Sequence, residues 1–228
     1  MSECLLDDQA CWLRRECAPT DFACQALQRN PQLFERVLGS DCRDEECSVR
    51  GRFLSELIYP ALKACSDDSN GDEGRFADLL LDLADELEEV PKFVETILGT
   101  MKAQSIAHQA GKARKPGKDA GKGQEGGSTI YVYVDRRAEE LYGPFPKPPC
   151  KPKDYACIAY HYPELHRYAV GTEGCYDEQC SKRGFRPAWI LWPVLRACGQ
   201  EASEDKEKFY SCVRGFSSLL RSIAQQFR

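Results

Sequence analysis

The sequence predicts an all-α protein made of two homologous, disulfide-stapled small helical domains. Two observations support this prediction: five cysteines recur in register, and an apolar stripe of helical period follows them in both copies. The gaps between cysteines are six, seventeen, four and seventeen residues in each run, and the second run begins 133 residues after the first. Such a recurrence indicates an internal duplication. The runs are Cys17, Cys24, Cys42, Cys47, Cys65 and Cys150, Cys157, Cys175, Cys180, Cys198.

The first helices are expected from caps and prolines. Ser2 can cap a helix that runs to about Glu16. Thr20 and Asp21 open a short helix that carries Cys24. Pro31 suits the first turn of the next helix, which Gly39 ends.

A fourth helix should begin near Asp44 and Glu45, whose carboxylates suit the positive end of a helix dipole, and carry Cys47. It should bend or stop near Pro60, because a proline inside a helix removes one backbone hydrogen bond. After Pro91 the first copy adds one further helix, whereas the second copy runs on to Phe227.

The apolar stripe marks one long packing helix in each copy. Its residues recur at i, i+3, i+4, i+7 and i+11, which is the pattern of a helix with one buried face. They are Phe76, Leu79, Leu80, Leu83 and Leu87 in the first copy, and Phe209, Cys212, Val213, Phe216 and Leu220 in the second.

The domain boundaries follow from composition. Residues 1–106 form the first repeat, with its core at 17–90, and residues 150–228 form the second. Residues 107–128 are a Gly/Lys-rich flexible linker, and residues 129–149 are an extended arm in which 130–134 alternate as in a strand.

Bulk properties exclude several classes of protein. The chain has 228 residues and a net charge of −5, which argues against nucleic acid as a partner. No apolar run approaches the roughly 20 residues of a membrane span. The residues after Met1 lack the basic start and apolar stretch of a secretory signal.

Thirteen cysteines fit structural disulfides better than a metal site or a catalytic thiol. Zinc sites favour close pairs such as C-x2-C, and thiol enzymes need a C-x-x-C pair or a partner histidine. No two cysteines have this spacing. His161 and His166 occur only in the second copy, and the first copy has Gln28 and Leu33 near the matching positions. We therefore expect no catalytic residues, no metal and no cofactor.

Each run has an odd number of cysteines, so each copy should need a sixth. In the second copy this is Cys212 on the apolar stripe, where the first copy has Leu79. In the first copy Cys4 or Cys11 can serve, and we place Cys11 in the framework. Within one helix the two lie roughly 10 Å apart, too far to bond each other. The expected framework is the ten recurrent cysteines with Cys212 and Cys11, leaving one thiol over.

Aromatic residues of the second copy are candidates for contact with a partner. Trp189 replaces Glu56 of the first copy, so that face was exposed in the ancestral unit, and exposed tryptophans often mark interfaces. The alternative is packing on the arm of the same chain. The candidate contact residues are Trp189, Trp192, Tyr131 and Tyr133.

Two resemblances bear on function. The spacing of Cys4, Cys11 and Cys17, together with Cys42-Arg-Asp-x2-Cys47, resembles in part the helical cysteine-rich domains of GDNF-receptor-α co-receptors. Cysteine-stapled helices without a signal peptide are similar in kind to coiled-coil-helix proteins of the mitochondrial intermembrane space. The typical C-x9-C and C-x3-C pairs of the latter are absent, as is any Asn-x-Ser/Thr sequon.

These features together favour a protein that is not an enzyme. We expect an accessory or scaffold subunit that binds other protein subunits, in an oxidising compartment and specifically the mitochondrial intermembrane space. The alternative is a secreted, cysteine-rich helical binding protein or receptor ectodomain.

Overall fold

Helices dominate the computed structural model, which describes residues 4–5, 8–35, 54–112, 144–166 and 187–228, without side chains for 103–112. No strand occurs among these residues, so the predicted all-α class is confirmed for the described part. The N-terminal half, through Lys112, contains α1 (Gln9–Arg14), α2 (Phe22–Arg29), the 3-10 helix η1 (Pro31–Phe34), α4 (Leu54–Asp68) and α5 (Glu73–Lys112). The C-terminal half, from residue 144, contains α7 (Tyr155–Tyr160), η2 (Pro163–His166), α9 (Pro187–Ala202), α10 (Lys206–Ala224) and η3 (Gln225–Phe227).

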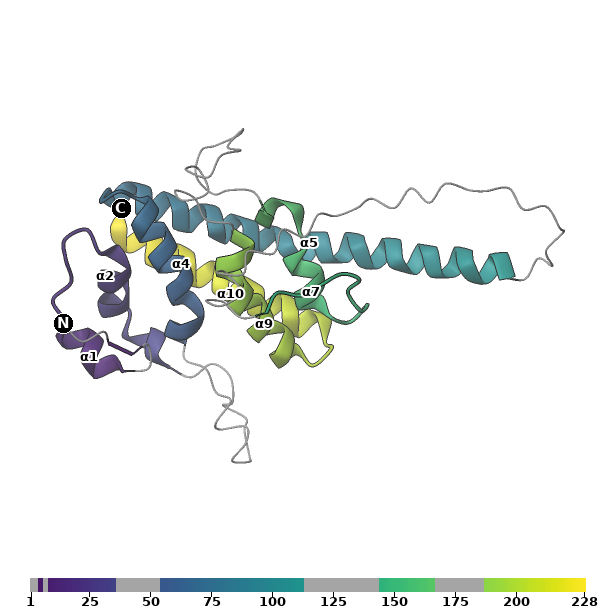
Figure 1. Ribbon diagram of the computed structural model, residues 1–228, viewed down its shortest axis with the longest axis horizontal. Helices are drawn as coiled ribbons and strands as arrows, with labels where there is room; N and C mark the ends of the chain where they lie inside the picture. Colours follow the sequence, from purple (N-terminus) through teal and green to yellow (C-terminus); the bar gives the residue numbers. More distant parts are fainter. Residues whose placement is uncertain (1–3, 6–7, 36–53, 113–143, 167–186) are drawn as a thin grey trace, which may run out of the picture.

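The two long helices that carry the apolar stripes pack against each other, α5 from one half and α10 from the other (Figure 1). They run antiparallel: Lys206 at the start of α10 pairs with Glu95, while Arg228 beyond its end pairs with Asp78. Nine of the ten stripe side chains are buried, and Cys212 is half-buried. Each helix thus buries its apolar face largely against the other half of the chain.

The two halves share one hydrophobic core rather than forming the two separately packed units that the sequence suggested. One cluster of buried side chains includes residues of both halves, and α4 also packs on α9. Phe227 lies edge-on to Phe76, with ring centroids 4.8 Å apart, and also contacts Phe22. The reason is that a single amphipathic helix cannot cover its stripe alone, and the nearest matching stripe lies in the other half.

The first helix is much shorter than the predicted span from Ser2 to Glu16. α1 begins only after Asp8, whose Oδ1 accepts a hydrogen bond from the backbone N–H of Cys11 at 2.9 Å. Cys4 and Leu5 therefore precede the helix instead of lying within it. The cap gives the N–H of Cys11 a partner, which in a helix that began earlier would be a backbone carbonyl oxygen of the preceding turn.

The two interior prolines do not end their helices. α4 runs through Pro60, and α5 continues through Pro91, where a separate helix was predicted. α10 contacts α5 on both sides of Pro91, through Arg221 with Asp85 and Lys206 with Glu95. Packing on one continuous neighbour holds α5 together despite the lost backbone hydrogen bond.

Local geometry recurs at the interval of 133 residues. Asp21 and Asp154 cap α2 and α7 through hydrogen bonds of 3.0 Å from Cys24 N–H and Cys157 N–H. The ring pairs Phe22–Phe76 and Tyr155–Phe209 have centroid separations of 5.3 and 5.8 Å.

The turns before the two long helices also correspond. Asn70 and Gly71 have φ of 53° and 81°, and Ser203 and Glu204 have φ of 45° and 72°. Residues other than glycine rarely adopt this left-handed conformation, and two in succession are rarer still. The same backbone path therefore leads into α5 and α10.

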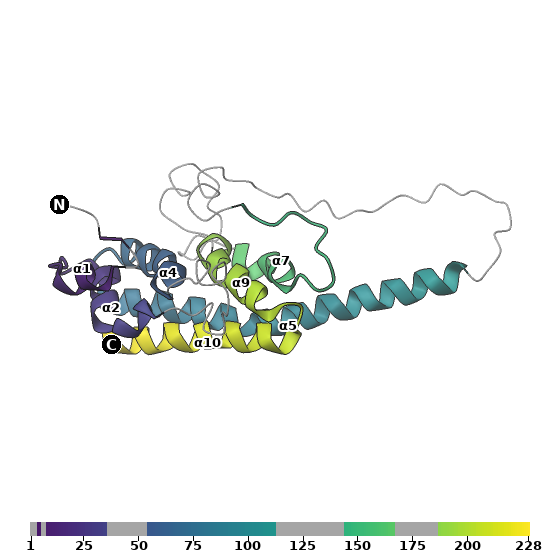
Figure 2. The ribbon, with the colours of Figure 1, turned by 90° about the horizontal axis from the view of Figure 1, so that it is seen from below.

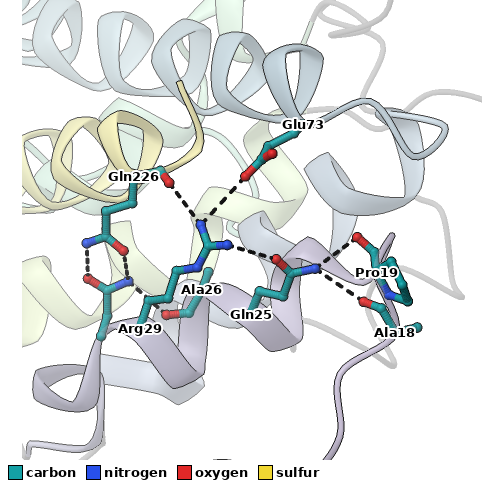
Figure 3. A network of polar contacts seen from close by, with 8 residues as sticks. Ala18, Pro19, Gln25, Ala26, Arg29, Glu73 and Gln226 are labelled. Carbon is teal, nitrogen blue, oxygen red and sulfur yellow. Dashed lines mark hydrogen bonds and ion pairs between the residues drawn. The ribbon is translucent and has the colours of Figure 1, made fainter.

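A polar network joins α2 to the end of the chain (Figure 3). Asn30 is fully buried and exchanges two side-chain hydrogen bonds with Gln226, at 3.0 and 2.8 Å. Arg29 donates to the carbonyl oxygen of Gln226 at 2.9 Å and lies 3.6 Å from a carboxylate oxygen of Glu73. This network ties both halves together at the edge of the core.

Several predictions fall partly or wholly outside the described residues. α5 extends to Lys112, so the first residues of the predicted 107–128 linker are helical. The rest of that linker, the strand-like run 130–134 with Tyr131 and Tyr133, and the cysteines at 42, 47, 175 and 180 lie outside the described residues.

Candidate functional site

Two disulfides with matching geometry lie at the starts of α2 and α7. Cys17–Cys24 and Cys150–Cys157 each span seven residues, and each has a Cα–Cα distance of 5.6 Å. In each pair the second cysteine lies in the first turn of a helix capped by an aspartate, so the bridge fixes the chain entering that helix. All four cysteines belong to the set that the sequence predicted to form disulfides.

The third recurrent cysteine within the described residues behaves differently in the two halves. Cys198 is bonded to Cys212, which links α9 to α10 with a Cα–Cα distance of 5.5 Å. The corresponding Cys65 is a free, fully buried thiol, contrary to its predicted place in the framework. The physical reason is that the position matching Cys212 is Leu79, which has no sulfur.

Burial raises the pKa of the Cys65 thiol well above its usual value, and the charges of Asp68 and Asp82 add to the effect. A raised pKa keeps the thiol protonated near neutral pH, and the thiolate is the reactive form. Cys65 is therefore an inert core residue rather than a nucleophile.

Cys4 and Cys11 are bonded to each other, with a Cα–Cα distance of 5.7 Å. This overturns the prediction that they lie too far apart to bond. The prediction assumed one continuous helix, but α1 begins only after Asp8, and Cys4 and Leu5 are not helical. Cys11 thus belongs to the framework, with Cys4 rather than a recurrent cysteine as its partner.

The tryptophans predicted to contact a partner lie against the same chain. Trp192 is buried, donates from Nε1 to the carbonyl oxygen of Pro144 at 3.1 Å, and packs on Tyr160. Trp189 is half-buried and stacks on Phe145, with centroids 6.5 Å apart. The segment before Cys150 thus covers this face of α9, which agrees with the alternative of packing on the arm of the same chain. Contact of either tryptophan with a partner stays a prediction.

Among the described residues of the C-terminal half, one cluster of side chains could hold a metal ion. Cys150, Cys157 and His161 each offer a ligand atom, and these atoms lie within 4.8 Å of one another. Cys157 and His161 are four residues apart and so share one face of α7, with His161 at its C-terminal cap. The sequence shows His161, but no metal site was expected, because close cysteine pairs are absent and the first copy has Gln28 at the matching position.

The surroundings of His161 favour its neutral form. Burial, followed by the charge of His166, lowers the pKa of His161, which favours the neutral ring. The backbone of Pro146, which has no N–H, offers the ring a hydrogen-bond acceptor, and this raises the pKa of His161 slightly. The Nε2 atom of His161 is buried and has no hydrogen-bond partner.

The corresponding position of the N-terminal half has a different chemistry. Gln28 occupies the place of His161 and donates from its amide to the carbonyl oxygens of Trp12 and Arg15, at 2.8 and 2.5 Å. The amide nitrogen of Gln28 therefore joins α2 to the end of α1, and this half has no imidazole at the position of His161.

Comparison with known proteins provides no relative for this chain: no family model, curated protein or solved structure matches it. None of the described helices is both long and apolar enough to cross a membrane.

Proposed function

We propose that this protein is a non-catalytic accessory or scaffold subunit of a larger assembly, built from two duplicated helical units. The observation that carries the proposal is α5. This helix runs from Glu73 to Lys112, and its distal part extends beyond all the helices that pack on its first part (Figures 1 and 2). A helix that leaves its own core offers a long surface to another protein.

Duplication is supported by geometry as well as by cysteine spacing. The caps, the disulfides at the start of α2 and α7, the aromatic pairs and the left-handed turns recur at one interval. An interaction module that duplicated and then packed against itself would keep such a framework while its surface diverged. Binding rather than catalysis is the proposed role of that surface.

Four disulfides among the described residues are compatible with an oxidising compartment. Within that class we propose the mitochondrial intermembrane space. The proposal is supported by Cys198–Cys212, which staples two consecutive helices, and by the lack of a glycosylation sequon.

The test is native electrophoresis of membranes and soluble fractions from the source cells, with the protein tagged. The proposal expects migration with an assembly much larger than the 25.7 kDa chain, and enrichment with intermembrane-space markers. Migration as a free monomer in every fraction would contradict the scaffold role. A secreted protein would instead appear in the medium.

A matched pair of variants tests the part assigned to α5. Met101→Glu places a charge on a half-buried position of the distal helix, and Thr100→Glu places the same charge on an exposed neighbour. The proposal expects Met101→Glu to release the subunit from its assembly while Thr100→Glu does not. Equal behaviour of both variants would move the contact away from this face.

A further inference from the structure

The C-terminal half holds a latent metal site beside its first disulfide. We propose that Cys150, Cys157 and His161 bind Zn²⁺ when the Cys150–Cys157 bond is reduced, so that the same two sulfurs serve either a disulfide or a metal. Two sulfurs and one imidazole nitrogen are a known zinc donor set, in which water or another ligand takes the fourth position.

The positions of the three donors support this assignment. Their ligand atoms lie within 4.8 Å of one another, in a site where Cys157 is buried and the other two side chains are half-buried. A bound zinc ion lies about 2.3 Å from each sulfur and 2.0–2.1 Å from the nitrogen, so the two sulfurs, bonded here, would move apart on reduction to bind it.

The histidine has the features of a metal ligand. Its Nε2 is buried and has no hydrogen-bond partner, and the backbone of Pro146 offers the ring an acceptor. Histidines that bind metals usually make this outer contact to a carbonyl or carboxylate, because it sets the tautomer and orients the ring. A buried acceptor without a partner is costly, and a metal ion would satisfy it.

The N-terminal half is an internal contrast. Its Cys17–Cys24 bond has the same Cα–Cα distance, but Gln28 replaces the histidine. The amide nitrogen of Gln28 donates hydrogen bonds to two backbone carbonyl oxygens. The proposed site is therefore a property of the C-terminal half alone. It goes beyond the scaffold role and does not depend on it.

The chemistry balances as two steps. A dithiol reductant gives two electrons and two protons to the Cys150–Cys157 bond, which yields two thiols and the disulfide of the reductant. Zn²⁺ then displaces the two thiol protons to water and forms two Zn–S bonds and one Zn–N bond. Oxidation by a disulfide donor reverses the sequence and releases the ion.

The experiment uses the full chain, reduced with a water-soluble phosphine under anaerobic conditions, with and without Zn²⁺. A phosphine reductant takes up the oxygen of water as it cleaves each disulfide and does not compete as a thiol ligand. Each cysteine is then alkylated for a short time and its labelling measured by mass spectrometry. Circular dichroism follows the helical content in parallel.

The proposal expects Zn²⁺ to slow labelling of Cys150 and Cys157 in the wild-type chain, while labelling of Cys17 and Cys24 does not change. His161→Gln, which places the glutamine of the N-terminal half at this position, should abolish the protection and weaken Zn²⁺ binding about 100-fold, since even an outer partner of a ligand is worth roughly 10–100-fold. His166→Gln is the matched control and should keep the protection.

Three outcomes would overturn the proposal. The first is equal labelling of Cys150 and Cys157 with and without Zn²⁺. The second is protection that survives in His161→Gln. The third is a reduced chain that loses its helices and does not regain them with Zn²⁺, because the donor set requires a folded α7.

Discussion

Ser217 donates a hydrogen bond from its hydroxyl to the backbone carbonyl oxygen of Ala84 at 2.9 Å, and the two residues are 133 positions apart. Each therefore lies at the position that corresponds to the other in the two halves. They meet where α10 crosses α5, inside the shared core. Corresponding residues meet in this way where a pseudo-twofold axis passes between two antiparallel helices.

Removing this contact should destabilise the whole chain. Ser217→Ala deletes a buried donor, and we expect the free energy of unfolding to fall by about 1 kcal/mol. Ser218→Ala changes an exposed neighbour on the same helix and should have little effect. Urea unfolding followed by circular dichroism measures the stability of both variants. Equal stability of the two would show that this hydrogen bond does not stabilise the fold.

Restoring the missing cysteine of the N-terminal half should create a new disulfide. In Leu79→Cys the new thiol takes the place corresponding to Cys212 and should bond Cys65, which is free in the wild-type chain. Thiol titration in denaturant should therefore count one thiol fewer than in the wild type. The closed loop spans 14 residues in the natural pair. Such a loop stabilises by about 3 kcal/mol.

The control for this prediction is Leu79→Ser, which loses the same leucine packing but cannot form a bond. Oxidised Leu79→Cys should be the more stable of the two, and reduction should remove the difference. Two free thiols at 65 and 79 under oxidising conditions would show that the halves differ in backbone here.

Gly199 lies at a close approach between α9 and α7. A Cβ at this position would lie 2.7 Å from the Cβ of Ala156, which is closer than real side chains allow. We expect Gly199→Ala to lower the free energy of unfolding by about 1–3 kcal/mol.

Two further variants make the Gly199 test specific. Ala156→Gly in the Gly199→Ala background should recover part of the lost stability, because it removes the clashing atom. Gly215→Ala on α10 meets nothing within 4 Å and should raise the stability by up to about 1 kcal/mol. A neutral Gly199→Ala would mean that α7 and α9 lie farther apart than described.

Asp68 should make stability depend on pH. Burial raises its pKa from 3.8 to about 6, Arg75 lowers it, and Asp67 raises it further; its Oδ2 has no hydrogen-bond partner. Between these values the folded state holds a proton that the unfolded state has lost, so the contribution of Asp68 to stability falls as pH rises from about 4 to 6.

Asp68→Asn removes that dependence. At pH 7 this variant should be more stable than the wild type by roughly 1 kcal/mol, a modest difference because the carboxyl group is half exposed and solvent screens it. Below about pH 4 the two proteins should be equally stable. Urea midpoints across this range measure the difference. A stability difference that does not vary with pH would contradict the assignment.

The helical class and the helix faces could be predicted because both depend on short-range pattern. The stripes from Phe76 to Leu87 and from Phe209 to Leu220 follow the 3.6-residue period, and nine of their ten side chains are buried. The ends of helices were harder. Asp8 rather than Ser2 caps α1, and α5 passes through Pro91, because contacts with α10 outweigh the local preference of proline.

Cysteine pairing could be predicted only in part. The stripe placed Cys212 on the core side of its helix, and it does bond a cysteine of its own half. The assumption that every recurrent cysteine is bonded was wrong for Cys65, because a free thiol packs in an apolar core at little cost in stability. The histidine beside Cys150 and Cys157 is visible in the sequence, but the unpartnered Nε2 depends on the path of Pro146.

The most direct test of the shared core is to cut the chain between its halves. A protease site placed within residues 113–143 allows cleavage of the folded, oxidised protein. No disulfide among the described cysteines joins the two halves. Size-exclusion chromatography should show both fragments eluting together in native buffer and separating in denaturant without reductant. Fragments that separate in native buffer, each still helical, would contradict the single core.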